Sequence, residues 1–351
     1  MSVITRHLGK NGPAVPAVSV GLMSLGHVYG DAGDLETRLN FLNQMYEIGA
    51  RHWDAADGYG DVEEVVGEWF SRNPDKRKDI FYATKFGLKF SEGIMTVRND
   101  PDYIHEAIEK SLQRSKTDYI DLYYCHRVDG KNPIEKTVEC MAKLQRAGKV
   151  RHLGLSAISA RTLQRAHSVA PIAAVQVEYG PFSLEIEQKE APGQESVLET
   201  CKQLGVSVVA YSPLGQGFLT GKYRSAADFE DAFRPDRPDF AEGRFEKNLA
   251  LVKIISQVAK DAGEQGSGSV TNAQVALAWV LRQWEGIVPI PGTRNAERVK
   301  ENMAAANIAL TDEQDSAIRE AAQAREHGGQ YADYMAALTQ KDTPENTCVS
   351  G

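Results

Sequence analysis

The feature that most constrains this chain is a repeated alternation between short apolar runs and longer amphipathic segments. The apolar runs are nearly continuous, as in parallel strands that are buried on both faces. Between them, apolar residues recur at the spacing of one face of a helix. The chain repeats this strand-and-helix pattern about eight times. Such a pattern in one chain predicts a single α/β domain, a (β/α)8 or TIM barrel with parallel strands.

Local signals place the expected elements along the chain. Residues 5–16 contain K-N-G between short apolar segments, which predicts an N-terminal hairpin. Asp34 and the capping box Thr271–Gln274 are expected at helix N-termini. The expected barrel strands are 15–21, 52–54, 79–84, 119–125, 152–156, 173–177, 207–211 and 286–289. The expected helices are 34–46, 62–70, 102–115, 133–147, 160–169, 197–204, 248–262, 271–281 and 296–305, with an extra C-terminal helix at 312–325.

An open doubly wound sheet is the alternative architecture. A dinucleotide-binding sheet of that type would carry G-x-G-x-x-G after its first strand, and this chain has no such motif there. The similar run Gly215–Gly221 has one residue too many and follows a late strand. We therefore expect residues 1–340 to form one barrel domain and residues 341–351 to form a flexible polar tail.

Charge and composition exclude several classes of protein. The net charge is −8, so no broad basic field favours nucleic acid or an anionic membrane. No apolar run is long enough to span a bilayer, and the N-terminus lacks a secretory apolar region. The four cysteines form no C-x-x-C pair, which indicates free thiols in a reducing compartment. The sequence thus predicts a cytoplasmic protein without a nucleic-acid, membrane or metal partner, and it leaves the oligomeric state open.

Polar side chains follow three successive expected strands. Asp54 and Lys85 each lie at the end of such a strand. Tyr59 and His126 lie in the segments just beyond a strand end. The carboxyl ends of barrel strands meet at one mouth, where barrel enzymes carry their active sites. Each residue alone could be an ordinary loop residue, but four at the same end of the barrel favour an active site.

A longer set of motifs occurs in a fixed order. The chain contains W-D-A-A-D-G-Y-G at 53–60, A-T-K at 83–85, Y-I-D-L-Y-Y-C-H at 119–126, G-L-S at 154–156, A-V-Q at 174–176, A-Y-S-P-L-G at 210–215 and P-I-P-G-T at 289–293, with Arg298 and Asn302. This set resembles the aldo-keto reductase family over residues 5 to about 335. H-R-V-D at 126–129 resembles its branch of microbial and plant aldehyde reductases, which is close to the pyridoxal reductases.

The resemblance implies an NADPH-dependent oxidoreductase that reduces aldehydes or ketones to alcohols, of the alcohol dehydrogenase [NADP+] type. Tyr59 would donate the proton, and the nicotinamide would supply the hydride. An ordinary tyrosine has a pKa of about 10, too high for fast proton exchange near neutrality. A lysine ammonium about 4 Å from the phenol would stabilise the phenolate by roughly 4 kcal/mol at an effective dielectric of about 20. Lys85 would supply that charge, Asp54 would hold Lys85 in place, and His126 would orient the substrate oxygen.

The resemblance also implies where the cofactor NADPH/NADP+ would bind. Tyr211 would stack on the nicotinamide, whose carboxamide would bind Ser156 and Gln176. Arg294 and Arg298 would lie at the start of the last barrel helix, where a 2′-phosphate is favoured, so NADPH is expected over NADH. The full expected set is Gly21, Leu22, Met23, Asp54, Ser156, Gln176, Tyr211, Ser212, Leu214, Gln216, Gly217, Gly292, Thr293, Arg294, Arg298, Glu301 and Asn302.

Some positions depart from the family pattern, and these leave the specificity open. They are Trp53, Ala157, Gly180-Pro181 and Gln216. The expected partner is a small carbonyl compound, and a pyridoxal reductase-like specificity is one alternative. Another is a non-catalytic, cofactor-sensing subunit that resembles the β subunits of potassium channels.

The expected substrate pocket is formed by loops, which a single sequence does not shape. These are 22–33, 86–99, 127–132 and 222–247, of which the last is rich in Arg, Asp, Phe and Pro and is expected to be irregular. Aromatic residues in these loops favour an apolar or aromatic carbonyl substrate, unless they pack the loops themselves. They are Tyr29, Phe86, Phe90, Tyr223, Phe229 and Phe233.

Overall fold

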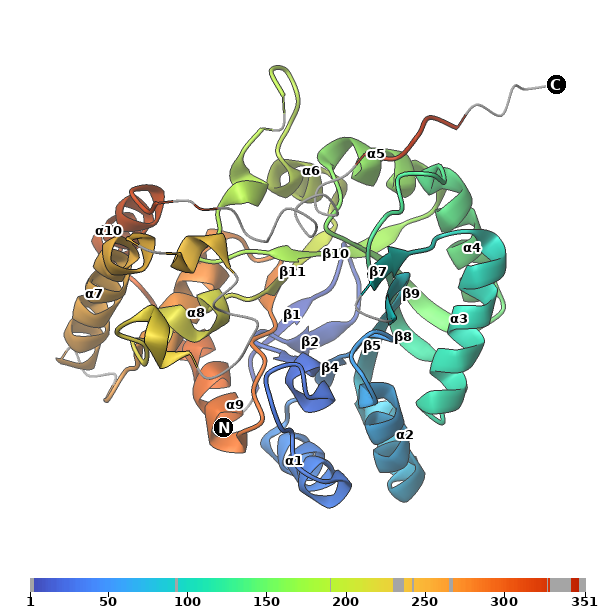
Figure 1. Cartoon of the computed structure of the whole chain (residues 1–351), viewed down its shortest axis with the longest axis horizontal. Coiled ribbons are helices and arrows are strands. Elements are labelled where there is room, and N and C mark those ends of the chain that lie inside the picture. The colour runs from blue at the N-terminus through green and yellow to red at the C-terminus, as the bar shows by residue number, and fades with distance from the viewer. Residues whose placement is uncertain are drawn as a thin grey trace.

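Eight parallel strands form the centre of the protein in the computed structural model (Figure 1). The structure describes residues 3–91, 94–189, 191–229, 237–241, 243–264, 268–326, 328 and 342–346. Neighbouring strands follow the order β3 (Val20–Gly21), β4 (His52–Asp54), β5 (Phe81–Phe86), β8 (Ile120–Cys125), β9 (Val150–Ser156), β10 (Ile172–Glu178), β11 (Ser207–Tyr211) and β12 (Ile287–Pro289). The Ser19 amide donates to the Pro289 carbonyl at 2.9 Å, and Gly21 forms a parallel bridge with Gly292. These contacts join the last strand to the first, so the predicted barrel is confirmed.

Helices surround the strands. The ring consists of α1 (Leu35–Ile48), α2 (Val62–Arg72), α3 (Pro101–Arg114), α4 (Ile134–Arg146), α5 (Ala160–Val169), α6 (Val197–Leu204), α8 (Asn272–Gln283) and α9 (Ala296–Ala304). Two more helices, α7 (Arg244–Ala262) and α10 (Asp312–Gln323), pack against each other at one side of the ring (Figure 1). Short 3-10 turns are η1 (Met23–Gly26), η2 (Pro74–Asp79), η3 (Glu185–Glu187), η4 (Gly215–Thr220), η5 (Ala226–Asp228), η6 (Pro238–Phe240) and η8 (Ala305–Asn307). The predicted extra C-terminal helix is therefore α10.

The N-terminal hairpin closes one end of the barrel. Its strands are β1 (Thr5–His7) and β2 (Ala14–Pro16), as predicted. Leu8 and Val15 pack into the apolar interior of the barrel. The Gly9 amide donates to the Ser207 hydroxyl at 2.7 Å, at the start of β11. Because the hairpin covers the amino ends of the strands, we expect any active site at the opposite mouth of the barrel, where the carboxyl ends of the strands lie.

Local sequence signals explain several boundaries. The Asp34 carboxylate accepts a hydrogen bond from the Thr37 amide at 2.8 Å, and so caps α1 as predicted. Thr271 and Gln274 form the predicted capping box at the start of α8. The barrel strands carry apolar side chains on both faces. One cluster of these side chains lies inside the barrel, and another lies between the strands and the helices. In the described part of the chain, no helix combines the length and the apolar character needed to cross a membrane.

Three segments differ from the sequence expectation. The expected strand 15–21 is divided between β2 and the short strand β3. The expected loop 86–99 contains an antiparallel hairpin, β6 (Leu88–Ser91) and β7 (Ile94–Val97), whose strands are too short to give a clear periodic signal. In the expected loop 222–247, α7 already begins at Arg244, and residues 230–236 and 242 lie outside the described residues.

Part of the expected C-terminal tail contacts the barrel. The Ile134 amide donates to the Thr343 hydroxyl at 3.2 Å, and Arg165 donates to the Thr343 carbonyl at 2.8 Å. The Ser159 hydroxyl, which caps α5, donates to Asp342. Residues 342–344 are thus held at the amino ends of α4 and α5. The expected domain boundary at residue 340 stays a prediction, and residues 341 and 347–351 lie outside the described residues.

Candidate active site

The four polar residues singled out from strand ends meet at the open mouth of the barrel. Asp54 is the last residue of β4, and Lys85 lies in β5. His126 directly follows β8, and its amide donates to the Phe86 carbonyl at 2.9 Å. Tyr59 lies in the segment between β4 and α2 and is half-buried. The barrel therefore brings together side chains that are far apart in the sequence.

Lys85 is at the centre of this group. Its side chain is fully buried, and its ammonium donates to Asp54 Oδ1 at 2.5 Å and to the Ala55 carbonyl at 2.6 Å. The Tyr59 hydroxyl lies 3.5 Å from the same ammonium, at the outer limit of a hydrogen bond. A buried ammonium needs both an anion and further hydrogen-bond acceptors to remain charged. Asp54 and Ala55 supply these partners and leave one side of Lys85 facing the phenol.

Burial and charge determine the protonation states. Burial would lower the pKa of Lys85, but the Asp54 carboxylate and the Tyr59 hydroxyl raise it above its ordinary value. Lys85 is therefore an ammonium near neutral pH. Burial, together with the charges of Arg127 and Lys85, lowers the pKa of His126 well below its ordinary value. The imidazole is thus neutral, with one ring nitrogen able to donate and the other able to accept.

Tyr59 and His126 face each other across the site. Their ring centroids are 5.8 Å apart at an interplanar angle of 83°, which is an edge-to-face contact. The His126 Nδ1 atom is buried and has no hydrogen-bond partner among the described residues. A phenol and a neutral imidazole thus lie in contact with each other at the mouth, and each has a hydrogen that it can donate to an oxygen atom.

Gln176, which is expected to bind the cofactor, also has a contact within the protein that the sequence did not predict. Its amide donates to Asp54 Oδ2 at 2.7 Å, while the other carboxylate oxygen binds Lys85. Gln176 pairs with Ser156 in the register of β10 and β9, so the two side chains lie at neighbouring strand ends. The Gln176 amide, which is expected to bind the nicotinamide carboxamide, is thus hydrogen-bonded directly to the carboxylate of the Lys85–Asp54 pair. Sequence spacing gives no signal for this contact, because Asp54 and Gln176 are 122 residues apart.

Arg127 is a buried residue that the sequence analysis also missed. Only 4% of it is exposed, and it donates to the Ser156 hydroxyl at 3.1 Å and to the His126 carbonyl at 2.7 Å. The only signal was its place directly after His126. A buried cation therefore lies beside two residues of the site.

The turn after β11 has an unusual backbone. Gly215, Gln216 and Gly217 all have positive φ, at 56°, 54° and 92°. Ser212, at the start of the same turn, and Ala157, after β9, are also left-handed at 48° and 51°. Non-glycine residues rarely adopt this conformation, and it is concentrated at functional sites. The amides of Gly215 and Gly217 donate within the turn, to the carbonyls of Ser212 and Leu214.

The expected adenosine side lies between β12 and α9. The Gly21–Gly292 bridge places Gly21, Leu22 and Met23 beside the start of this segment. Thr293 and Asn302 are buried, and Glu301 accepts a hydrogen bond from the Thr271 hydroxyl at 2.6 Å. The remaining expected residues, Tyr211 and Leu214, are half-buried near the turn after β11.

The two arginines at this end have different surroundings. Arg294 donates to the backbone carbonyls of Tyr29, Gly30 and Asp31, and so binds the loop after β3. Arg298 lies in the first turn of α9. The Asn295 side chain caps this helix by accepting a hydrogen bond from the Arg298 backbone amide at 3.1 Å. The Arg298 guanidinium is exposed and has no polar contact within the described residues. Of the two, Arg298 is the one whose side chain is available for an anion at the helix N-terminus.

The loop aromatics do not all line a pocket. Phe86 is fully buried and packs on Tyr123 at 5.0 Å between centroids. Tyr223 and Phe229 pack on each other at 4.8 Å, and Phe229 also contacts Phe240. These three rings contact other aromatic rings, in line with the alternative that the loop aromatics pack the protein itself, and their part in a substrate pocket stays a prediction. The Phe90 side chain and Phe233 lie outside the described residues.

The described residues contain no group of three or more His, Cys, Asp or Glu side chains that could hold a metal ion. Cys125, Cys140 and Cys201 are free and buried, and Cys348 lies outside the described residues. The acid–base groups of the site are therefore the phenol, the ammonium, the imidazole and the carboxylate described above.

Comparisons with known proteins agree with one another. The model of the Aldo/keto reductase family matches residues 17–323. The aldo-keto reductase yakc [NADP(+)] of Schizosaccharomyces pombe is 42% identical over 326 residues, which cover 92% of each chain. The aldo-keto reductase str7 of Strobilurus tenacellus is 42% identical and covers 98% of this chain and 99% of its own. The structure of the glycerol dehydrogenase AKR11B4 from Gluconobacter oxydans matches with a TM-score of 0.77 at 27% identity, covering 92% of this chain and 95% of that one.

Proposed function

The chain belongs to the aldo/keto reductase family, and we propose that it reduces aldehydes or ketones to alcohols with NADPH, as an NADP-dependent alcohol dehydrogenase does. One observation carries the proposal: a fully buried lysine, paired with a carboxylate, lies 3.5 Å from a phenol at the barrel mouth. This arrangement favours transfer of a proton from the phenol, because the ammonium stabilises the phenolate that remains. The name of the Schizosaccharomyces pombe relative supports NADP(+) as the cofactor.

The residues at the mouth suit a dinucleotide. Ser156 and Gln176 present a hydroxyl and an amide at adjacent strand ends, a donor and acceptor set that can bind a carboxamide. The left-handed turn Gly215–Gly217 follows β11 at the barrel mouth, and it is where we place the diphosphate. Arg298 lies at the start of α9, where the helix dipole also favours a phosphate. When bound, the nicotinamide supplies a hydride to the carbonyl carbon.

The protein's own groups then supply the proton and orient the substrate. The Tyr59 hydroxyl donates its proton to the carbonyl oxygen, which completes the alcohol and leaves a phenolate. Lys85 holds that negative charge, and Asp54 holds Lys85. The neutral imidazole of His126 donates a hydrogen bond to the same oxygen and fixes its direction. The phenolate then regains a proton from water, so the site returns to its starting state.

The direct test is turnover of NADPH with a panel of aldehydes and ketones, followed at the absorbance of the reduced nicotinamide. We expect consumption of one NADPH for each alcohol formed. A protein that binds NADPH tightly but reduces no member of a broad panel, pyridoxal included, would instead be a cofactor-sensing subunit. The panel therefore decides between the proposed activity and both alternatives that the sequence left open.

Cofactor choice gives a separate prediction. Arg298→Ala should weaken NADPH binding by about 1.5–3 kcal/mol, the range for a hydrogen bond to a charged group. NADH should lose much less, because it lacks the 2′-phosphate. Titration of both cofactors, followed by protein fluorescence, measures the difference, and higher salt should reduce the wild type's preference.

Arg294→Ala is the matched control, because its guanidinium binds loop carbonyls in the structure. It should change the two affinities by a similar factor. Equal losses of NADPH and NADH in Arg298→Ala would mean that Arg298 does not contact the phosphate. A wild type that prefers NADH would overturn the cofactor assignment.

A further inference from the structure

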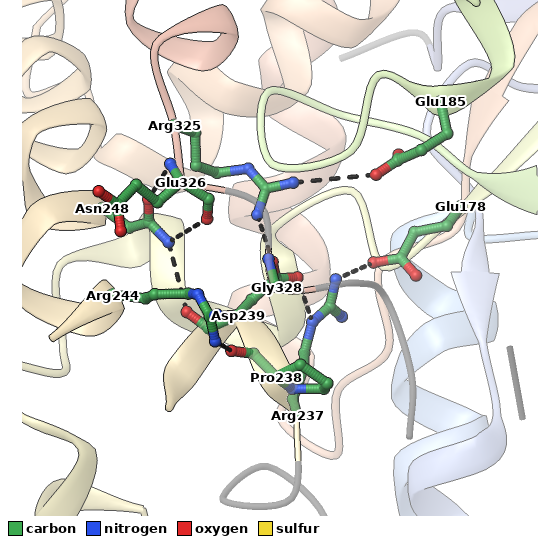
Figure 2. A network of polar contacts seen from close by, with 10 residues as sticks. All are labelled: Glu178, Glu185, Arg237, Pro238, Asp239, Arg244, Asn248, Arg325, Glu326 and Gly328. Atoms are coloured by element: carbon green, nitrogen blue, oxygen red, sulfur yellow. Dashed lines mark hydrogen bonds and ion pairs between the residues drawn. The ribbon is translucent and has the colours of Figure 1, made fainter. Parts of the chain in front are cut away.

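A group of four buried charged residues lies beside the barrel mouth and takes no part in the proposed chemistry (Figure 2). It consists of Glu178, Arg237, Asp239 and Arg325, which we call the Arg237 network. Each is 6% exposed or less as a whole residue, and each side chain is at most 2% exposed. Two arginines face two carboxylates within the group, and the partly exposed Glu185 carboxylate lies 3.9 Å from Arg325 (Figure 2). Ionised groups are very rarely buried this completely, so their position needs a reason.

Arg237 joins an irregular segment to the end of a barrel strand. Its guanidinium donates to Glu178 Oε1 at 2.8 Å and to Asp239 Oδ2 at 3.1 Å. Glu178 is the last residue of β10 and pairs in register with Tyr211 of β11. It is also two residues beyond Gln176, which contacts Asp54. Arg237 is therefore fixed at the strand end next to the proposed nicotinamide site.

The segment after α10 is held at the same place. Arg325 donates to Asp239 Oδ1 at 2.7 Å, and the Gly328 amide donates to the same oxygen at 2.9 Å. The side-chain amide of Asn248, in α7, binds the backbone of Glu326 twice: its nitrogen donates to the Glu326 carbonyl, and its oxygen accepts from the Glu326 amide (Figure 2). A Cβ atom at Gly328 would lie 2.3 Å from the Pro238 carbonyl oxygen, so only glycine fits there. The segments 237–239 and 325–328, which are remote in sequence, thus meet at Asp239.

The network supports the segment that follows β10. The Arg325 guanidinium lies 4.3 Å from the ring centroid of Phe182, and the Arg237 guanidinium lies 5.5 Å from it. Both are within the range of a cation–π contact, which is stronger in a desolvated site. Phe182 is 1% exposed. Glu178 and Phe182 therefore hold both ends of the short segment 178–182 against the two arginines.

This segment packs directly on the left-handed turn after β11. Phe182 contacts Phe218, in the same turn, at 5.0 Å between ring centroids. A Cβ atom at Gly180 would lie 2.6 Å from the Pro213 carbonyl oxygen, so the two backbones are in close contact. The unusual Gly180 noted in the sequence is thus explained by its approach to the turn. The contacts run without a gap from Arg237, through residues 178–182, to residues 213–218.

We propose that Arg237 and Arg325, held by Glu178 and Asp239, are positioning residues for the turn that binds the cofactor diphosphate. They contact neither cofactor nor substrate and act through Phe182 and Gly180. A rigid support matters because the left-handed residues Ser212 and Gln216, which are not glycines, are strained and keep their conformation only where the surroundings impose it. The inference rests on the proposed function, since it takes the turn to be a diphosphate site.

The test is Arg237→Met, which keeps an unbranched apolar side chain and removes the guanidinium and its charge. We expect the affinities for NADPH and NADH to fall by the same factor, about tenfold, mainly through faster release. The two cofactors share the diphosphate, so the loss should not depend on the 2′-phosphate. Binding of 2′,5′-ADP, which has no diphosphate bridge, should stay within about twofold. Stopped-flow cofactor fluorescence measures the release rates.

A second readout does not involve cofactor binding. Amide hydrogen exchange of residues 212–220 should become faster in Arg237→Met without any cofactor, while exchange in β4 and β5 stays the same. If Arg237→Met does not fold, Gly328→Ala leaves all four charges in place and should displace the Asp239 contact by steric clash, with a smaller effect in the same direction.

Lys247→Met is the matched control. Lys247 pairs with Glu326 at 2.5 Å close to the same network, but its side chain is 63% exposed. An exposed pair of this kind contributes little, so cofactor release should not change.

The outcomes separate the two proposals. Unchanged cofactor release and unchanged exchange of residues 212–220 in folded Arg237→Met would overturn the positioning role and leave the proposed function intact. A wild-type protein that binds neither NADPH nor NADH would instead overturn the proposed function. A larger loss for NADPH than for NADH would place the effect at the adenosine phosphate and would also overturn the inference.

Discussion

Tyr59→Phe should reduce aldehydes at least about a hundredfold more slowly than the wild type, the scale of a lost general acid. The substitution removes only the hydroxyl, which lies 3.5 Å from the Lys85 ammonium. The phenyl ring can keep its edge-to-face contact with His126. No other described hydroxyl replaces that of Tyr59 beside this ammonium, so the proton must come from water. Steady-state turnover with a saturating aldehyde measures the loss.

NADPH binding should survive in Tyr59→Phe, because the proposed cofactor contacts do not include the phenol. Tyr46→Phe is the control: it also removes a hydroxyl, whose contact is with Asp79 on the outside of the protein. That variant should retain full activity. Near-wild-type turnover in Tyr59→Phe would remove Tyr59 from its role as the proton donor.

Lys85→Met should lose both activity and stability. The activity should fall at least about a hundredfold, because the phenolate loses its stabilising cation. The stability should fall by about 3–5 kcal/mol, the cost of removing one partner from a buried ion pair. Asp54 would remain 2% exposed at its side chain with no cation beside it. Burial already raises the pKa of Asp54, so in this variant its carboxyl should take up a proton near neutral pH.

The double variant Asp54→Asn, Lys85→Met separates the two effects. It removes both charges, so the free energy of unfolding should recover most of the loss seen in Lys85→Met. Activity should not recover, because the ammonium is still absent. Chemical denaturation and turnover, measured on the same protein, provide the comparison. A double variant as unstable as Lys85→Met would show that the two charges do not stabilise the fold as a unit.

The barrel could be predicted because its signals are local. The bounds predicted for α5 and α6 from their periodic apolar residues agree with the structure. So do the bounds predicted for β4 and β11 from their apolar runs. The Asp34 cap and the Thr271–Gln274 box act within one helical turn. The β6–β7 hairpin was missed because its strands are short and contain few periodic residues. Strand pairing of that kind depends on a partner more than on the segment's own sequence.

The candidate catalytic residues could be identified for a related reason. Once the barrel is inferred, every strand end is assigned to one mouth, and Asp54, Lys85 and His126 follow from their places in the sequence. The Tyr59 segment adds a motif that resembles the family. The loop aromatics carried no such positional information. Tyr223 and Phe229 could equally line a pocket or pack together, and the structure shows that they pack together.

The sequence by itself determined the barrel, its family and the set of residues at its mouth, because periodicity, capping and motif order are all properties of neighbouring residues. Only the tertiary structure decided which of these residues touch. The bond from Gln176 to Asp54 spans 122 residues, and that from Arg325 to Asp239 spans 86. Arg237 lies in a segment that the sequence predicts to be an irregular loop, yet it is buried against Glu178. The physical reason is that a buried charge is stable only beside its partner, and that partner is brought to it by the closure of the barrel.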